Sequence, residues 1–243
     1  MNCKKEEKRI VAFIQKEFKA RGFKNAIIGI SGGIDSAIVA ALLVKALKKQ
    51  NVYGILLPYS EQKDIDDSEQ LIKQLDIYSE TYQINNAVDE VSRGMGFENY
   101  NIRTGNIKAR MRMIYLYDRS FSYKALVIGT GNRTEELLGY FTQYGDGACA
   151  INPIVHLYKT EVFELAKYLK LPKAIIEKAP TAGLWEGQTD EEELGATYEE
   201  IDNCLKRWKD GCRIKVSEKV ADMVIARVER NKFKLEMPGM IKR

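Results

Sequence analysis

The chain has 243 residues, enough for one large domain with a substantial core, so we interpret residues 1–243 as a single domain. An apolar fraction of 45% and a charged fraction of 30% are typical of a soluble globular protein. A net charge of +4, with acids and bases interspersed, is too small to indicate a nucleic-acid partner. There is no apolar run of membrane-spanning length and no signal peptide, so we expect a cytoplasmic protein with no membrane partner.

The chain has too few suitably spaced cysteine and histidine residues for a zinc site or a cysteine–histidine catalytic pair. The four cysteines have no CxxC spacing, and His156 is the only histidine. A zinc site or a cysteine–histidine dyad would need more than this. We therefore expect the chemistry to depend on metal ions and positioned charges.

Predicted strands and helices alternate through the first half of the chain. Apolar residues at helical spacing predict helices over 4–21, 35–49, 64–75, 86–95 and 101–120. Short apolar or alternating runs predict strands over 27–30, 52–57, 78–84 and 125–129. This alternation predicts an α/β fold, a parallel sheet with helices on both faces, whose ligands bind beyond the carboxyl ends of the strands.

The second half is less regular. We expect a loop over 140–152 and a helix over 159–169. The segment 179–193 is rich in glycine and is expected to be mobile and to act as a lid. Further helices are predicted over 197–208, which opens with a capping box, and over 216–230.

One loop between the first strand and the following helix has the composition of a phosphate site. It consists of Gly29, Ile30, Ser31, Gly32, Gly33, Ile34, Asp35 and Ser36. Gly32 and Gly33 allow positive φ and a close approach to a ligand. Backbone amides at such a turn and helix start bind anions, the serines add hydroxyl donors, and Asp35 can hold a divalent cation against phosphate oxygens. Neither the Walker spacing nor a GxGxxG fingerprint is present.

This string resembles the SGGxDS pyrophosphate loop of the N-type ATP pyrophosphatases, which cleave ATP to AMP and pyrophosphate. Further strings at 106–113, 129–135, 139–147, 158–162 and 178–184 resemble the ammonia-dependent NAD synthetases. The resemblance implies a Rossmann-like adenine nucleotide alpha hydrolase fold. It also implies that ATP adenylates the nicotinate carboxylate of deamido-NAD, releasing pyrophosphate, before ammonia displaces AMP to give NAD.

The same resemblance implies roles for residues at the ATP end. The loop from Gly29 to Ser36 would bind ATP, as would Thr130, Lys159 and Thr181. Asp35 and Glu135 would bind magnesium, both expected at strand ends. Asp35, Lys159 and Thr181 are the implied catalytic residues: Asp35 as a magnesium ligand, and Lys159 and Thr181 because a cation and a hydroxyl suit a departing pyrophosphate.

At the deamido-NAD end, the resemblance implies contacts from Arg110, Gln143 and Lys234. A guanidinium fork such as that of Arg110 suits a dinucleotide phosphate or a carboxylate. Many family members carry Lys and Asp where this chain has Gln143 and Ala150. That departure concerns how the nicotinate-ribose end is held.

Two further expectations concern partners. The segment before the loop fits one helix and no amidase domain, so ammonia is expected to be used directly or delivered by a separate protein. Related synthetases are dimers, and the predicted helix 101–120 has two apolar stripes, of which one can face the sheet while the other needs a partner. The stripes consist of Ile107, Met111, Ile114 and Phe121, and of Ala109, Met113 and Leu116. We expect a homodimer with Met113 and Leu116 at the contact; the alternative is a helix buried within one large domain.

Other functions remain open on the residues alone. Pyrophosphatases of tRNA thiolation, GMP synthesis or asparagine synthesis share the loop, although the thiolation enzymes usually need paired cysteines or an RNA-binding face. A non-catalytic adenine-nucleotide binding module would have no reason to keep Asp35, Glu135, Lys159 and Thr181 together. A structural or interaction protein, like a loop that binds no ligand, would leave the Gly29–Ser36 stretch unexplained.

Overall fold

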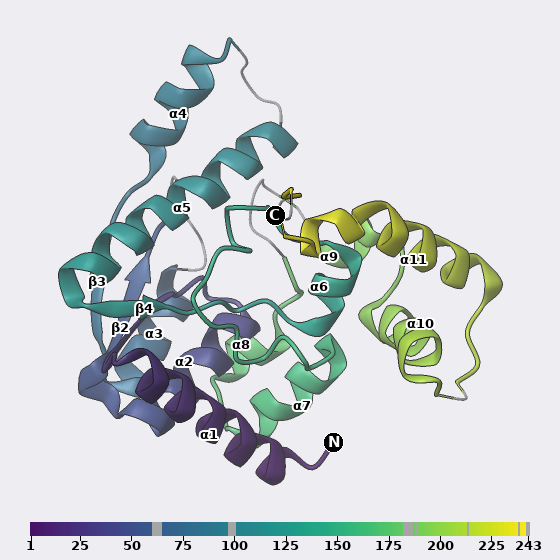
Figure 1. The fold of residues 1–243 in the computed structure, drawn as a ribbon, viewed down its shortest axis with the longest axis horizontal. Coiled ribbons are helices and arrows are strands. Elements are labelled where there is room, and N and C mark those ends of the chain that lie inside the picture. Colours follow the sequence, from purple (N-terminus) through teal and green to yellow (C-terminus); the bar gives the residue numbers. More distant parts are fainter. Residues whose placement is uncertain are drawn as a thin grey trace.

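The structure is a computed structural model that describes residues 1–59, 65–96, 101–181, 187, 189–212, 214–237 and 239–241. Within these residues the sheet has four parallel strands in the order β3-β2-β1-β4 (Figure 1). They are β1 (Asn25–Gly29), β2 (Val52–Leu56), β3 (Tyr78–Thr81) and β4 (Ala125–Val127). Ile27 of the central strand pairs with Tyr53 on one side and Val127 on the other. The predicted parallel α/β sheet is confirmed.

Helices cover both faces of this sheet. Neighbouring residues of a strand point to opposite faces, so fully buried Ile27 and Ile28 pack into two different apolar clusters. The cluster around Ile28 includes residues of α1 (Cys3–Arg21), α2 (Ile34–Leu47), α3 (Ile65–Leu75), α7 (Lys159–Tyr168) and α8 (Lys173–Glu177). The cluster around Ile27 includes residues of α4 (Asn85–Gly94) and α5 (Asn101–Tyr123).

A third apolar cluster lies beside the sheet and joins the second half of the chain. Leu138, Tyr158, Ile201 and Val224 are all buried in it. Its elements are α6 (Arg133–Leu138), α9 (Asp190–Leu194), α10 (Tyr198–Asp210) and α11 (Glu218–Asn231), and α10 and α11 pack side by side at the far right of Figure 1. Two single-turn 3-10 helices, η1 (Lys49–Asn51) and η2 (Lys232–Leu235), complete the described elements.

The longer predicted elements are confirmed, with bounds shifted by up to three residues. Three short helices, α6, α8 and α9, were not predicted, because five or six residues contain too little of a helical period to stand out. The last of them corrects the predicted mobile segment 179–193, whose residues from Asp190 onward are helical. Residues 182–186 and 188 of that segment lie outside the described residues. In the described part of the chain, no helix has the length and apolarity needed to cross a membrane.

Candidate active site

The predicted phosphate loop connects β1 to α2 at the carboxyl end of the central strand. Gly32 has a φ of +76°, the left-handed conformation that glycine adopts without strain. Gly33 does not: its φ of −89° is extended, and it forms the N-cap of α2. The expectation of positive φ was therefore right for Gly32 and wrong for Gly33. Ile30 and Ile34 are nearly fully buried, so the surface of the loop is backbone and small polar side chains.

Both serine hydroxyls bond within this loop. The Gly33 N–H donates to Ser31 Oγ at 3.2 Å, and Ser36 Oγ donates to the Gly33 carbonyl at 2.9 Å. The two hydroxyl oxygens are 3.1 Å apart. No side chain caps the N-terminus of α2, so its first amide groups are available to an anion. The loop is thus already shaped by its own hydrogen bonds.

Three predicted residues meet next to this loop. The Lys159 ammonium Nζ lies 2.6 Å from Asp35 Oδ2 and 3.2 Å from Glu135 Oε1, although these residues are 124 and 24 positions apart. Lys159 is only 3% exposed. Burial alone would lower the pKa of its ammonium, but attraction to Asp35 and Glu135 outweighs burial and raises that pKa above the usual value. Lys159 is therefore a fixed buried cation.

The two carboxylates of this cluster are not equivalent. Burial raises the pKa of Glu135 to about 7; Lys159 opposes the rise and the neighbouring Asp35 adds to it. The second oxygen of Asp35, Oδ1, accepts a hydrogen bond from Asn132 Nδ2 at 2.9 Å.

Asn132 organises this arrangement and was not among the predicted site residues. Fully buried, it caps α6: its Oδ1 accepts from the Glu135 N–H at 3.0 Å, and its own N–H donates to Glu135 Oε2 at 3.2 Å. Glu135 therefore lies in the first turn of α6 and Asp35 in the first turn of α2, which corrects the expected place of both residues at strand ends. The Asn-x-x-Glu spacing of a capping box was the sequence signal that could have found both features.

A second carboxylate site borders the cluster. Asp190, the first residue of α9, is buried and accepts hydrogen bonds from the hydroxyls of Tyr198 at 2.9 Å and Tyr140 at 3.1 Å. Lys159 Nζ is 5.1 Å from the centroid of the Tyr198 ring. Burial raises the pKa of Asp190, while Lys159 opposes the rise. Nothing in the local sequence marked this residue, and one of its partners, Tyr140, comes from a segment 50 positions away.

The two predicted ATP-contacting threonines lie at the ends of other segments. Thr130 is half-buried and follows Gly129, where a Cβ atom would come within 2.6 Å of Cys149 Sγ, so only glycine fits. Thr181 follows Pro180, whose carbonyl accepts from the Asp190 N–H at 3.0 Å. This hydrogen bond connects the backbone next to Thr181 to the first residue of α9. The ATP contacts of both threonines stay predictions.

The three residues predicted to contact deamido-NAD gather around the loop from Gly139 to Gly147. Arg110, exposed on α5, donates through Nε to the Gln143 carbonyl at 3.3 Å. Lys234 Nζ donates to the carbonyls of Gly139 at 2.7 Å and Phe141 at 2.9 Å. The ammonium of Lys234 is thus engaged by backbone in this structure, and it shapes the loop.

A metal ion at this site would have two protein carboxylates available, those of Asp35 and Glu135. Within the described residues, no group of three or more Asp, Glu, His or Cys side chains is arranged to hold a metal ion. This donor set fits Mg²⁺, which is typically bound by one or two carboxylates together with substrate phosphates and water.

The helix expected at the dimer contact presents the opposite side from the one predicted. Leu116 is 3% exposed and packs into the cluster around Ile27, so it cannot contact a partner. Ile114 and Phe121 are 61% and 88% exposed. The stripe that contains Leu116 faces the sheet. Of the other stripe, Ile114 and Phe121 face outward, whereas Ile107 and Met111 are half-buried and pack against the cluster around Ile27.

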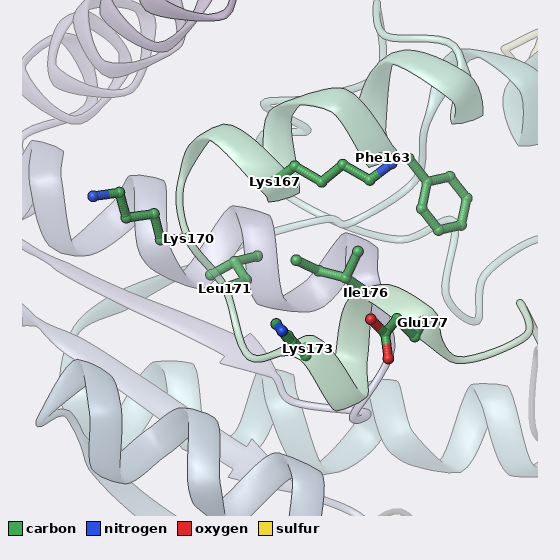
Figure 2. Close-up of a pocket in the computed structure, with 7 residues that line it drawn as sticks. All are labelled: Phe163, Lys167, Lys170, Leu171, Lys173, Ile176 and Glu177. Carbon is green, nitrogen blue, oxygen red and sulfur yellow. The ribbon is translucent and has the colours of Figure 1, made fainter.

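A separate cavity of about 550 Å³ lies between α7 and α8 (Figure 2). Lysines and Glu177 surround apolar side chains such as Phe163 and Leu171 there. None of the predicted site residues lines this cavity. The candidate active site is therefore the loop and the buried acid–lysine cluster at the carboxyl ends of β1 and β4.

A parallel α/β sheet with this loop after its first strand, facing a buried lysine and two carboxylates, defines a nucleotide-binding protein of the N-type ATP pyrophosphatase fold. The model of the NAD synthase family matches residues 6–238. An "NH(3)-dependent NAD(+) synthetase" of Fusobacterium nucleatum is 42% identical over 100% of this chain and 97% of its own length. The chain belongs to the NAD synthase family, whose members are ligases.

Two solved structures resemble the whole chain. The NMN synthetase of Francisella tularensis matches with a TM-score of 0.92 and 37% identity, and 100% of each chain is covered. An NH3-dependent NAD synthetase of Campylobacter jejuni matches with a TM-score of 0.86 and 35% identity, again over 100% of each chain.

Proposed function

We propose that this chain converts deamido-NAD to NAD with ATP and ammonia, the last step of NAD biosynthesis. ATP adenylates the nicotinate carboxylate and releases pyrophosphate, and ammonia then displaces AMP to form the amide. The observation that carries the proposal is the buried Lys159 held between Asp35 and Glu135 beside a loop shaped for phosphate. A carboxylate is a poor electrophile, and adenylation gives it a leaving group.

We assign the metal and phosphate roles to this cluster. Bound Mg²⁺ would neutralise phosphate charge as the pyrophosphate leaves. Asp35 and Glu135 would hold the ion, and the amides of the Gly29–Ser36 loop would hold phosphate oxygens. The Lys159 ammonium, held beside these carboxylates, would stabilise the charge of the departing pyrophosphate, where Thr130 and Thr181 add hydroxyl donors. The buried position of Lys159 supports this role, because charge stabilisation is stronger away from water.

At the other substrate end, we assign binding of the dinucleotide to the loop that contains Gln143. Arg110 is exposed and donates to the loop through Nε, so the other N–H groups of its guanidinium can face a ligand. Lys234 would act by holding the carbonyls of Gly139 and Phe141 in place. Gln143 would offer an amide to the nicotinate-ribose end.

We also propose a homodimer through the outward stripe of α5. Ile114 and Phe121 are large apolar side chains exposed on one side of the same helix as Arg110, and such a stripe is stable in water when a partner covers it. Replacing both by glutamate should give monomers in sedimentation at micromolar concentration and weaken deamido-NAD binding more than ATP binding. Ile102→Glu, equally exposed but on another side of the helix, is the control. A wild-type monomer with full activity would disprove the dimer.

The reaction is tested by supplying ATP, Mg²⁺, ammonium and deamido-NAD. NAD, AMP and pyrophosphate should form in equal amounts, whereas release of ADP and phosphate would refute the assignment. Glutamine in place of ammonium should give little product. Glu136→Gln, next to the cluster, serves as the control for Glu135→Gln.

A second candidate is the same reaction on a mononucleotide. It is favoured by the likeness to the NMN synthetase of Francisella tularensis, at a TM-score of 0.92. The chemistry would be unchanged, with nicotinate mononucleotide in place of deamido-NAD. Measuring kcat/KM for both substrates at fixed ATP and ammonium decides between them, since the true substrate should be preferred at least tenfold.

A further inference from the structure

Asp202 is a buried carboxylate that none of the proposed roles uses. It lies on α10 and is fully shielded from solvent. Its Oδ1 accepts a hydrogen bond from Thr134 Oγ1 at 2.5 Å, and its Oδ2 accepts from the Thr160 N–H at 2.8 Å. Burial raises the pKa of this carboxyl, so keeping it ionised there has a cost that the hydrogen bonds and nearby Lys206 offset.

The bonds of Asp202 lead to the backbone of both charged partners in the active site. Thr134 Oγ1, which donates to Asp202, also accepts from the Lys159 N–H at 2.9 Å. Thr134 directly precedes Glu135 in α6, and Thr160 directly follows Lys159 in α7. One carboxylate therefore connects the first turns of two helices, one of which carries Glu135 and the other Lys159.

This connection is more than the N-terminus of α7 requires. The capping box of that helix already satisfies the Tyr158 N–H through Glu161 Oε2 at 3.0 Å. Water or a side chain of α7 itself could satisfy the next two amides, as at many helix ends. Instead, the partners of those amides come from α6 and α10, which fixes α7 relative to α6. Errors of about 1 Å in such positions can cost about a hundredfold in rate.

We propose that Asp202 is a positioning residue for the reaction: through Thr134 and Thr160, it sets the place of the Lys159 ammonium relative to the Glu135 carboxylate. Asp202 touches no reacting atom; it acts on the peptide units that carry these two side chains. The role rests on the proposed function, because the pair it aligns is the one that would hold Mg-ATP.

The chain offers a matched pair of variants for this test. Thr134→Val keeps the shape of the side chain but removes the hydroxyl that joins Lys159 to Asp202, whereas Thr134→Ser keeps the hydroxyl. Thr197→Val is the structural control, because it removes the capping hydroxyl of the same helix α10 at its exposed end. Folding of each variant is checked by its urea unfolding midpoint.

Binding of Mg-ATP is measured by calorimetry without the second substrate. The dissociation constant should rise at least tenfold in Thr134→Val, stay within threefold in Thr134→Ser and stay within twofold in Thr197→Val. Kinetics should show a lower kcat and a higher KM for ATP in Thr134→Val, while the KM for the nicotinate substrate changes less than twofold. If Thr134 and Asp202 only stabilised the fold, Thr134→Val would lower the folded fraction but would not change the KM for ATP more than the KM for the nicotinate substrate.

Folded Thr134→Val that binds Mg-ATP as tightly as wild type would overturn the proposal. If Thr134→Val does not fold, Asp202→Asn is used instead, because it keeps the acceptor for the Thr160 N–H and reverses the bond to Thr134. The two proposals fail separately: a wild-type protein that binds Mg-ATP but amidates neither nicotinate nucleotide refutes the function alone. The variant comparison on binding still decides the role of Asp202.

Discussion

Replacing Lys159 by methionine removes one buried positive charge and leaves two carboxylates facing each other. The Lys159 side chain is 4% exposed, and those of Asp35 and Glu135 are 17% and 19% exposed. Removing one partner of a buried ion pair costs about 3–5 kcal/mol. Each carboxylate keeps one hydrogen bond from Asn132 and some contact with solvent, so we expect a loss at or below the lower limit of that range, about 2–3 kcal/mol at pH 8.

The loss should depend on pH in a definite direction. Without the ammonium, which lowers the pKa of Glu135, the folded-state pKa of that carboxyl rises further above its unfolded value. A carboxyl whose pKa is raised on folding binds more protons in the folded state, so stability increases as pH falls. The difference between wild type and Lys159→Met should therefore shrink to about 1 kcal/mol at pH 5, where Glu135 is protonated in both proteins.

Urea unfolding at pH 5 and pH 8, each with and without added Mg²⁺, measures both effects. Mg²⁺ should restore stability to Lys159→Met at pH 8 more than to wild type, because the ion replaces the missing cation. Lys178→Met is the control: Lys178 pairs with Asp67 at 3.0 Å with both side chains about a quarter exposed, and its loss should be under about 1 kcal/mol. An equal loss for Lys159→Met at both pH values would refute the electrostatic explanation.

Further outcomes are expected at neighbouring positions. Asp35→Asn and Glu135→Gln should each lower kcat at least a hundredfold, which corresponds to about 3 kcal/mol of transition-state stabilisation, while circular dichroism shows an intact fold. A variant with a near-normal rate at saturating Mg²⁺ would rule out metal binding by the residue that was replaced. Because the folded-state pKa of Glu135 is raised to about 7, the unfolding free energy of wild type should fall by up to about 3 kcal/mol relative to that of Glu135→Gln as the pH rises from 4.5 to 7.5 in metal-free urea titrations. A difference between the two proteins that does not change with pH would contradict that pKa. Gly139→Ala should cost about 2–4 kcal/mol, since Gly139 has a φ of +61° and its new Cβ would overlap Asn231, whereas Gly22→Ala, with φ of +72° and open space, should cost only about 1.

The parts of the fold that could be predicted have sequence patterns that either repeat over many residues or form one unbroken stretch. The helix from Cys3 to Arg21 repeats its apolar positions over several turns, and the phosphate loop is one unbroken string after a buried strand. Such features are fixed by neighbours in the chain, so periodicity and turn chemistry reveal them. The five-residue helix α9 had no such support and was interpreted as part of a mobile segment.

Lys159 and Glu135 were predicted as site residues from the family resemblance, but the residues that surround them could not be predicted from the sequence. Asp202 contacts Thr134 across 68 positions, and Asp190 contacts Tyr140 across 50. Only the packing of α9 and α10 beside α6 brings these groups together, and no local pattern encodes that packing. The two stripes of α5 show the same limit: the sequence contained both, and burial of Leu116 decided which one faces the sheet.

Glu135 divides its two oxygens between different tasks. Oε2 closes the capping box with the Asn132 N–H, and Oε1 faces Lys159. Aspartate at this position would be one methylene too short to do both, so glutamate is required by length as well as by charge. The division also makes the start of α6 a built-in reporter: hydrogen exchange of the Asn132 amide should slow when a cation engages Oε1, because fraying of that turn would then have to break the cation contact as well.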